Sequence, residues 1–436
     1  MSILAQAQLA KEASIKLAVL TTKVKNKALL EIAESIKKNS KAIIDANKKD
    51  LQLAERHKLK QVLIDRLRID NNKLREMVGE TKNVAKLEDP VGKTLSQIEL
   101  DKGLMLYKVT CPIGVIGAIF ESRPDAVTQI SSLCIKSGNA VILKGGSEAL
   151  NSNRILVKII SQVAEKNGLP KGAVQIIETR KQVSDLLELH DYIDLIIPRG
   201  SNAFVKYVQE HTKIPVLGHS EGICHVYVDK DADIRKAINI SFDAKCQYPA
   251  VCNAMETLLV HKDIAKKFLP KMIEKFKKAN VEMRGDERTR KIVRNIKSAT
   301  ETDWSIEYND FILSIKIVND LYESINHINK YSSNHTDAIV TENKKNAEKF
   351  MNLVDSSSVI WNASTRFADG FRYGKGAEVG ISTAKIHARG PVGLDGLIIY
   401  KYKLVGKGHI VRDYVGKNKR KFRHKVIKNL RYRQLH

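Results

Sequence analysis

Several features that are common in proteins are missing from this chain of 436 residues. No apolar run reaches the roughly 18 residues needed to cross a bilayer, and the N-terminus lacks the basic region and apolar core of a secretory signal. The five cysteines are an odd number without a Cys-x-x-Cys pair, which favours reduced thiols over disulfides or a zinc site. These absences predict a cytoplasmic protein that spans no membrane and binds no metal. The length suggests two or three domains.

Acidic residues are scarce relative to basic ones, and the net charge is +25. This charge suggests nucleic-acid binding, but no RNA-binding motif with interleaved aromatic residues is present. Residues 417–436 contain nine Lys or Arg and no acid, so the rest of the chain carries 25 − 9 = +16, spread over lysine-rich helix faces. A solvated basic surface with a basic tail is therefore predicted. It leaves only non-specific contact with RNA through charge.

The hydrophobic pattern changes twice along the chain. Residues 1–85 repeat apolar positions at helical spacing and predict helices. Residues 94–110 predict two strands around Asp101-Lys102-Gly103, a hairpin turn. From residue 111 onward, short apolar strands alternate with amphipathic helices, which is typical of parallel sheets covered on both faces. Strands are expected at 115–120, 140–143, 174–177, 195–198, 223–228, 255–260, 312–318, 337–340, 358–361 and 397–405.

Two turns follow predicted strands and open predicted helices. They are Lys144-Gly145-Gly146-Ser147 and Arg199-Gly200-Ser201. Glycine lets main-chain N–H groups approach a phosphate, and a helix N-terminus favours its negative charge. Ordinary strand-to-helix turns also carry glycine, and the G-x-G-x-x-G fingerprint of dinucleotide sites is missing. The turns indicate either a phosphate-containing ligand or common turn chemistry.

Cys252 lies in a tight turn directly before the apolar strand at 255–260. A thiol there can point into a cleft while the strand anchors its backbone, as a covalent catalyst requires. The alternative is a small buried hydrophobe, which is what most free cysteines are. Residues 364–393 are rich in glycine and predict a long loop, a feature that is usually functional or disordered in a compact protein.

Long blocks of the sequence carry a resemblance to one family. The blocks are PIGVIGAIFESRPDAVTQ (112–129), LCIKSGNAVILKGGSEALNSN (133–153), DLIIPRGSNAFVKYV (194–208), GHSEGICHVYVDKDAD (218–233), VCNAMETLLVH (251–261), HTDAIVTE (335–342) and NASTRFADGFRYGKGAEVGISTAKIHARGPVGL (362–394). Over about residues 5–412 the chain resembles the γ-glutamyl phosphate reductases of the aldehyde dehydrogenase superfamily. The resemblance implies an α/β fold with two Rossmann-like open parallel-sheet domains and a β oligomerisation arm.

The resemblance also implies how the chain is divided. An NADP(H)-binding domain is expected from residues 1–93 and 111–240, and a catalytic domain carrying Cys252 from 241–393. The oligomerisation arm is expected from 94–110 and 394–412, followed by the basic C-terminal tail at 413–436. The implied partners are a second copy of the chain, as a homo-oligomer, and a glutamate 5-kinase in transient contact.

The implied reaction is the NADPH-dependent reduction of L-glutamyl 5-phosphate to L-glutamate 5-semialdehyde, with release of phosphate, on the route from glutamate to proline. Cys252, as thiolate, would attack the acyl carbon, and the thioester would then take a hydride. Main-chain N–H groups, with Asn253, would hold the oxyanion. Because an ordinary thiol has a pKa of about 8.5, the site needs nearby positive charge, for which Arg123 is a candidate.

The resemblance assigns binding residues as well. The Lys144–Ser147 turn would hold the adenosine ribose, the Arg199–Ser201 turn the pyrophosphate, and Glu307 the nicotinamide ribose. Ser147 with Lys144 would accept a 2′-phosphate, which supports NADP(H), whereas the neighbouring Glu148 leaves NAD open. The residues expected around the substrate are Arg123, His219, Glu221, Asn362, Arg366 and Arg389. For each arginine, the alternative to substrate binding is an ordinary surface ion pair. For His387, the choice between a substrate-binding and a structural role stays open.

One departure from the superfamily separates two activities. Hydrolytic relatives carry a Glu-Leu-Gly-Gly segment whose Glu activates water, and the matching region here is Gly218–Gly222, where Glu221 is not in the same motif. A reductase should lack an efficient water-activating base, because hydrolysis would waste the thioester. The alternatives are an oxidative aldehyde dehydrogenase and a basic RNA-binding protein built on an inactive enzyme fold.

Overall fold

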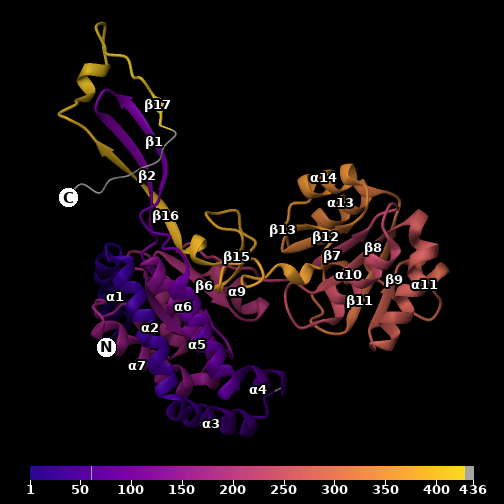
Figure 1. The fold of residues 1–436 in the computed structure, drawn as a ribbon. Helices are drawn as coiled ribbons and strands as arrows, with labels where there is room; N and C mark the ends of the chain where they lie inside the picture. Colours follow the sequence, from indigo (N-terminus) through magenta and orange to yellow (C-terminus); the bar gives the residue numbers. More distant parts are fainter. Residues whose placement is uncertain (60, 428–436) are drawn as a thin grey trace.

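The computed structural model describes residues 1–59 and 61–427, so the end of the predicted basic tail, 428–436, lies outside the described residues (Figure 1). Five helices form the N-terminal region: α1 (Ile3–Leu17), α2 (Thr22–Lys38), α3 (Ser40–Arg56), α4 (Gln61–Leu67) and α5 (Asn71–Lys86). The predicted helices are confirmed. The Asp70 side chain accepts a hydrogen bond from the N–H of Lys73 and caps the N-terminus of α5.

A four-stranded parallel sheet packs against these helices in the order β5-β4-β3-β6. Its strands are β3 (Val115–Phe120), β4 (Ala140–Lys144), β5 (Val174–Ile176) and β6 (Leu195–Arg199). Its helices are α6 (Asp125–Ser137), α7 (Leu150–Lys166), α8 (Arg180–Glu188) and α9 (Asn202–Glu210), with a short 3-10 helix η1 (Ser147–Ala149) after β4. One hydrophobic core joins this sheet to α1, α2 and α5, so the N-terminal helices and the small sheet form one domain.

A second parallel sheet has seven strands in the order β10-β9-β11-β8-β7-β12-β13. They are β7 (Cys224–Val228), β8 (Met255–His261), β9 (Glu282–Gly285), β10 (Lys297–Ser298), β11 (Ile312–Val318), β12 (Thr336–Val340) and β13 (Ser358–Trp361). The accompanying helices are α10 (Ile234–Cys246), α11 (Lys262–Lys278), α12 (Glu287–Ile292), α13 (Leu321–Tyr331) and α14 (Lys344–Leu353), with the 3-10 helix η2 (Glu301–Ser305). Two separate cores, one with α10 and α11 and the other with α13 and α14, show that both faces are covered.

The predicted boundary between the two domains needs a correction. The sequence placed residues up to 240 with the first domain, but β7 pairs with β8 and β12 inside the second sheet. The first sheet therefore ends with β6, and β7 and α10 belong to the second domain. The hydrophobic pattern could not show this, because strand and helix alternate in the same way on both sides of the boundary.

The predicted arm is present as a four-stranded antiparallel sheet that projects away from both domains (Figure 1). It contains β1 (Thr94–Asp101), β2 (Leu104–Pro112), β16 (Ile398–Val405) and β17 (Lys425–Val426) in the order β16-β2-β1-β17. Gly103 has φ +79°, as its hairpin turn requires. The tail is not separate from the arm, because β17 pairs with β1 and the hydroxyl of Tyr414, in the 3-10 helix η5 (Val411–Tyr414), donates to Asp101 at 2.9 Å.

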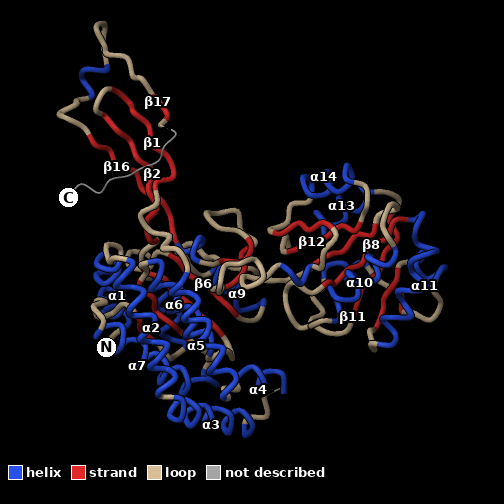
Figure 2. Tube along the Cα trace, in the orientation of Figure 1, coloured by secondary structure: helices blue, strands red, loops and turns tan. Residues whose placement is uncertain are grey.

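Residues 364–393, predicted as a loop, carry the chain from the second domain back to the first (Figure 2). They contain a 3-10 helix η3 (Thr365–Phe367) and two paired strands, β14 (Gly380–Ser382) and β15 (Gly390–Val392), before η4 (Leu394–Leu397). Val379 and Val392 pack into the core of the first domain. Within the described parts of the chain, no helix is both long and apolar enough to cross a membrane.

Candidate active site

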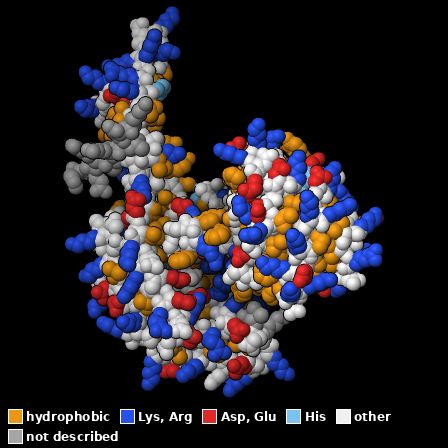
Figure 3. All heavy atoms as spheres, turned by 45° about the vertical axis from the view of Figure 1, so that its right-hand side comes forward, with side chains coloured by type: hydrophobic (Ala, Val, Ile, Leu, Met, Phe, Trp, Pro, Cys, Tyr) orange, Lys and Arg blue, Asp and Glu red, His pale blue; other side chains and the backbone are white. Residues whose placement is uncertain are grey.

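Opposite edges of the two sheets contribute the residues of the site. Cys252, Gly222 and His335 shortly precede the neighbouring strands β8, β7 and β12, so they share the amino edge of the second sheet. In the first sheet, β4 and β6 end at Lys144 and Arg199, which lie at its carboxyl edge. The molecular surface is hollowed between the two domains (Figure 3).

Direct contacts join these two edges. The amide Nδ2 of Asn202, at the start of α9, donates to Oε2 of Glu307 in the second domain at 3.1 Å. Nη2 of Arg66, in α4, donates to the carbonyl of Ala250 at 3.2 Å. The N-terminal domain therefore contacts both the turn that carries the thiol and the segment that carries Glu307.

The turn that holds Cys252 connects α10 to β8. Gly222 packs against the main chain of Cys252, and a Cβ at Gly222 would lie 2.6 Å from the carbonyl carbon of Cys252. The thiol of Cys224, the first residue of β7, donates to the carbonyl oxygen of Cys252 at 3.1 Å. Burial raises the pKa of Cys224, and burial raises the pKa of Cys246 to about 11. Half-buried Cys252 is thus the cysteine of this region that suits a nucleophile.

Two guanidinium groups lie within electrostatic reach of the Cys252 sulfur. Burial lowers the pKa of Arg199, and Arg123 lowers it further, whereas Glu378, Asp125 and Cys252 act in the opposite direction. Burial also lowers the pKa of Arg366, while Cys252 and Asp369 oppose this. Nη1 of Arg199 is enclosed and has no hydrogen-bond partner among the described residues. The sequence named Arg123 as the cation for the thiol, whereas the guanidinium groups that interact electrostatically with Cys252 are those of Arg199 and Arg366.

Two histidines stand beside the thiol, and the sequence identified only one of them. His219 was predicted, whereas His335 was not assigned a role. A ring nitrogen of each lies within 4.8 Å of the Cys252 sulfur and of the other. Burial lowers the pKa of His219, which keeps the ring neutral, and its Nδ1 donates to the carbonyl of Ile381 at 2.8 Å. Its Nε2 is therefore an acceptor.

Glu378 is a second site residue that the sequence did not reveal. Burial raises the pKa of this carboxyl group, while Arg199 and the N–H of Gly370 lower it. Its Oε2 accepts a hydrogen bond from the Gly370 N–H at 2.8 Å. Glu378 therefore fixes the glycine-rich segment next to Arg199. Glu221, in contrast, is exposed.

Asn253 follows the thiol and was predicted to help hold an oxyanion. Its amide Nδ2 donates to the carbonyl of Ala368 at 2.9 Å, and its Oδ1 is buried without a partner among the described residues. An amide nitrogen carries two hydrogens, so one donor of Asn253 remains after this contact. The contact also ties the thiol turn to the segment that carries Arg366.

Two predicted substrate residues have other positions or partners. Asn362 hydrogen-bonds to the N–H and the carbonyl of Thr341, beyond the carboxyl end of β12 and one strand length from His335. Arg389 forms an ion pair with Asp355 at 3.0 Å and also donates to the Asp355 and Thr383 carbonyls. These partners use the amide of Asn362 and the guanidinium of Arg389 in structural roles. The undecided His387 lies 2.9 Å from the Gly396 carbonyl, through Nε2, and is structural too.

The two glycine turns are filled by acids of the chain itself. Glu148 lies directly against Gly146 and accepts hydrogen bonds from the N–H and hydroxyl of Ser122 at 2.6 and 2.7 Å. Glu121 accepts a hydrogen bond from the Ser201 N–H at 3.0 Å, and a Cβ on Gly200 would lie 2.8 Å from its Oε2. These glycines make room for the acids, which is a different reason from the phosphate approach that the sequence suggested.

Two basic side chains, Lys144 and Arg180, lie near each other at the first of these turns. Burial lowers the pKa of Lys144, Glu148 opposes this, and Arg180 at the start of α8 lowers it further. Lys144, exposed Ser147 and exposed Arg180 therefore form a basic corner at the end of β4. Sequence spacing could not reveal Arg180, because it follows a different strand, β5.

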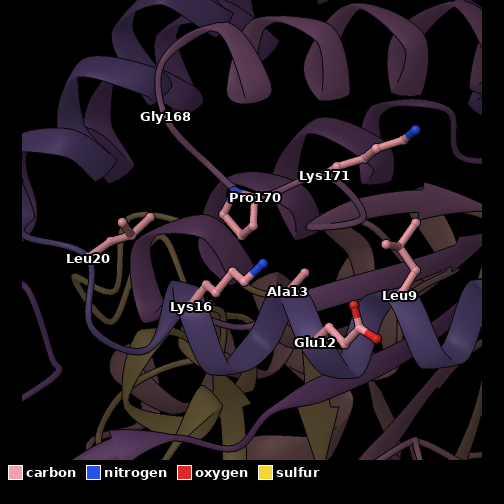
Figure 4. A pocket seen from close by; sticks show the side chains of 8 residues that line it. All are labelled: Leu9, Glu12, Ala13, Lys16, Leu20, Gly168, Pro170 and Lys171. Carbon is pink, nitrogen blue, oxygen red and sulfur yellow. The ribbon is translucent and has the colours of Figure 1, made fainter.

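A separate cavity of about 280 Å³ lies between α1 and the segment before β5 (Figure 4). It is lined by Leu9, Glu12, Ala13, Lys16, Leu20, Gly168, Pro170 and Lys171. Because 168–171 precede β5, this cavity lies at the amino edge of the first sheet, opposite to Lys144 and Arg199. It is not part of the site around Cys252.

Comparison with known proteins agrees with this geometry. The aldehyde dehydrogenase family matches residues 2–295. The gamma-glutamyl phosphate reductase of Methanococcoides burtonii is 58% identical over 428 residues, which cover 96% of this chain and 95% of that protein. The one from Acetivibrio thermocellus is 57% identical over 424 residues, covering 97% and 98%. The crystal structure of the gamma-glutamyl phosphate reductase from Thermotoga maritima has a TM-score of 0.92 at 43% identity, covering 94% of this chain and all of that one.

The fold and the thiol between two domains define the chain as a member of the aldehyde dehydrogenase family. Within that family, it belongs to the gamma-glutamyl phosphate reductases.

Proposed function

We propose that this protein reduces L-glutamyl 5-phosphate to L-glutamate 5-semialdehyde and phosphate with a nicotinamide coenzyme, in the second step from glutamate to proline. The observation that carries the proposal is the Cys252 thiol, held at a sheet edge within electrostatic reach of Arg199 and Arg366. A cation such as Arg366 beside the thiol also matches a substrate that carries a phosphate and a carboxylate. The relatives at 57–58% identity bear the name of this activity.

In the proposed reaction, the Cys252 thiolate attacks the acyl carbon of the substrate and forms a C–S bond. The C–O bond to phosphate breaks, and phosphate leaves with the electron pair next to an arginine. The bound coenzyme supplies the hydride for the thioester carbon. The C–S bond then breaks, which releases the aldehyde and returns Cys252 to the thiolate. Main-chain N–H groups, with the remaining amide hydrogen of Asn253, stabilise the developing oxyanion.

Water must be kept from the thioester in this reaction. Glu221 is exposed, and Glu378 is engaged with Gly370 and Arg199. The Glu378 oxygen that already accepts the Gly370 N–H is less available to orient a water molecule. This arrangement supports a reductase over an oxidative aldehyde dehydrogenase.

We further propose that the coenzyme is NADP(H). Lys144 and Arg180 interact electrostatically at the turn that carries Ser147, and this basic corner suits a 2′-phosphate. Glu148 was the reason for keeping NAD as an alternative coenzyme. Its carboxylate instead accepts hydrogen bonds from the N–H and hydroxyl of Ser122. The enclosed, unpartnered Nη1 of Arg199 suits the pyrophosphate, and Glu307, bonded to Asn202, suits the nicotinamide ribose.

The arm supports a homo-oligomer. Tyr400, Tyr402 and Leu404 on β16 are 43%, 60% and 59% exposed, and β16 is an edge strand of the arm sheet. An edge strand with exposed apolar side chains is a natural contact for a second copy. Five free cysteines are consistent with an enzyme of the reducing cytoplasm. We also propose that a glutamate 5-kinase hands over the labile acyl phosphate in a transient contact.

The test is Cys252→Ser, assayed in reverse as NADP-dependent oxidation of glutamate semialdehyde with phosphate. We expect kcat to fall at least about 10³-fold, while Cys246→Ser keeps its activity. Activity retained in the Cys252→Ser protein would overturn the covalent mechanism. Full wild-type turnover in phosphate-free buffer would instead indicate an oxidative aldehyde dehydrogenase.

A further inference from the structure

His219, His335 and Cys252 form a compact cluster of nitrogen and sulfur donors. One ring nitrogen of each histidine and the Cys252 sulfur all lie within 4.8 Å of one another. The two imidazole rings meet edge to face, with centroids 4.8 Å apart. The three residues precede the neighbouring strands β7, β12 and β8, so the sheet itself brings them together.

Both histidines have one nitrogen engaged and one free. Nδ1 of His219 donates to the Ile381 carbonyl at 2.8 Å, which leaves a lone pair on Nε2. Nδ1 of His335 lies 2.9 Å from the Thr336 hydroxyl, and its Nε2 is buried with no partner among the described residues. His335 is 0% exposed. Metal-binding histidines are held in this way, with the second nitrogen hydrogen-bonded to a protein oxygen.

We propose that this cluster is an inhibitory binding site for a soft divalent cation, with Zn²⁺ the best match. Two imidazole nitrogens and a thiolate are ligands that Zn²⁺ prefers, and they leave the fourth tetrahedral position open. Zn–N bonds of about 2.0–2.1 Å and a Zn–S bond of about 2.3 Å place the ligands roughly 3.3–3.6 Å apart. The cluster therefore contracts slightly when it binds the ion. The spacing of cysteines along the sequence could not reveal this site, because two of its ligands are histidines.

Binding replaces the proton of the Cys252 thiol by the cation: an S–Zn bond forms and H⁺ is released. The same sulfur lone pair attacks the acyl carbon in the proposed reaction, so the ion and the acyl substrate exclude each other. The inhibition rests on the proposed function, whereas the cation site does not. A test of metal binding can therefore fail or succeed independently of the enzyme activity.

The direct test uses Co²⁺ as a spectroscopic probe on the full-length, chelator-treated protein. We expect one equivalent of Co²⁺ to produce a thiolate-to-cobalt charge-transfer band with the visible bands of a four-coordinate ion. Cys252→Ala should abolish the charge-transfer band. His335→Asn and His219→Gln should each weaken Co²⁺ binding by about ten-fold or more.

Matched controls use a thiol and a histidine outside the cluster. Cys246→Ala and His211→Gln should keep the spectrum and the affinity of the wild type. Absence of a charge-transfer band in the wild type, its loss in Cys246→Ala, or unchanged affinity in both cluster histidine variants would overturn the proposal. Circular dichroism of each variant separates loss of the site from loss of the fold.

A second measurement needs no variant for its main result. Zn²⁺ should protect Cys252 of the wild-type protein from alkylation by iodoacetamide and inhibit turnover competitively with glutamate semialdehyde. A chelator should reverse both effects. His335→Asn should need about ten-fold more Zn²⁺ for the same protection. Equal protection of the variant and the wild type would show that Zn²⁺ binds the thiol without the histidines, which contradicts the proposed site.

Discussion

Gly222 lies against the main chain of Cys252 and leaves no room there for a side chain. We predict that Gly222→Ala displaces the thiol turn and lowers kcat/KM by about 10²-fold, because a displacement on the order of 1 Å in a reacting group can cost that much. The measurement is steady-state turnover together with the rate of Cys252 alkylation. Gly79→Ala is the matched control, since a Cβ at Gly79 meets nothing within 4 Å and should leave turnover unchanged. Wild-type kinetics in Gly222→Ala would contradict the close approach.

Arg180 tests the preference for the phosphorylated coenzyme. We predict that Arg180→Ala raises KM for NADPH by about ten-fold, since one charge-assisted contact to a phosphate contributes on the order of 1.5–3 kcal/mol. KM for NADH should stay near the wild-type value, because NADH lacks the 2′-phosphate. Lys158→Ala, another change on the same domain, is the control. An equal rise in both KM values would show that Arg180 does not contact the 2′-phosphate.

At the residue scale, the sequence identified the thiol and His219 but not His335, Glu378 or Arg180. Cys252 is recognisable because a turn and an apolar strand flank it. His335 precedes its strand in the same way, but only the strand order β8-β7-β12 shows that the two residues are neighbours. Glu378 acts through Gly370 and Arg199, contacts that no sequence period describes. Asn362 and Arg389 have side chains suited to binding a substrate anion, but they contact Thr341 and Asp355 of the protein itself.

Among the elements, β8 and α10 share a buried ion pair next to the thiol turn. Nζ of Lys245 lies 2.6 Å from Oε2 of Glu256, and both side chains are almost fully buried. Glu256 also accepts a hydrogen bond from the Asn309 N–H at 3.2 Å, two residues from Glu307. The pair therefore connects the turn of Cys252 with the segment expected to hold the coenzyme.

We predict that Lys245→Met destabilises the fold by about 3–5 kcal/mol, because it leaves Glu256 buried without its cation. Burial raises the pKa of Glu256 from 4.5 to about 7, with Lys245 opposing that rise. Loss of Lys245 raises this pKa further, so the folded protein resists ionisation of Glu256 to a higher pH. The stability deficit of the variant relative to the wild type therefore grows as pH rises above about 7.

Thermal unfolding at pH 6 and pH 8 measures this effect. The double variant Lys245→Met/Glu256→Leu should recover much of the loss, since an apolar replacement removes the buried charge. Lys278→Met, which breaks the exposed pair with Glu274, should change stability by less than about 1 kcal/mol. A deficit that shrinks with rising pH would contradict the assignment.

At the scale of the whole molecule, the arm is the proposed contact with a second copy of the chain. We predict that Tyr402→Asp with Leu404→Asp shifts the protein toward the monomer, because two charges at an exposed edge strand oppose pairing with a second copy. Light scattering after size-exclusion chromatography measures the change in mass. Lys401→Asp with Lys403→Asp on the same strand is the control for charge alone. An unchanged mass in the first variant would place the interface elsewhere.

The alternation of strands and helices predicted the α/β fold and the arm, since each period reports a local property of the chain. It did not predict the sheet to which β7 belongs, because pairing of β7 with β12 joins residues more than 100 positions apart. It also did not predict the return of residues 364–393 to the first domain. That segment contacts two domains in turn, so its apolar residues follow neither the helical nor the strand period. The pairing of β17 with β1 was missed for a related reason, because two residues carry no pattern.

The division of the site between two sheet edges has a consequence for how the protein matures. During synthesis, Cys252 is made after Arg199 but long before His335, Arg366 and Glu378. The thiol therefore has only part of its cationic surroundings until residues 364–393 have returned to the first domain. The nascent chain therefore carries Cys252 without Arg366, and the complete site forms only after both domains have folded and met. Because its last residues are made late, the site cannot bind and turn over substrate until synthesis of the chain is nearly complete.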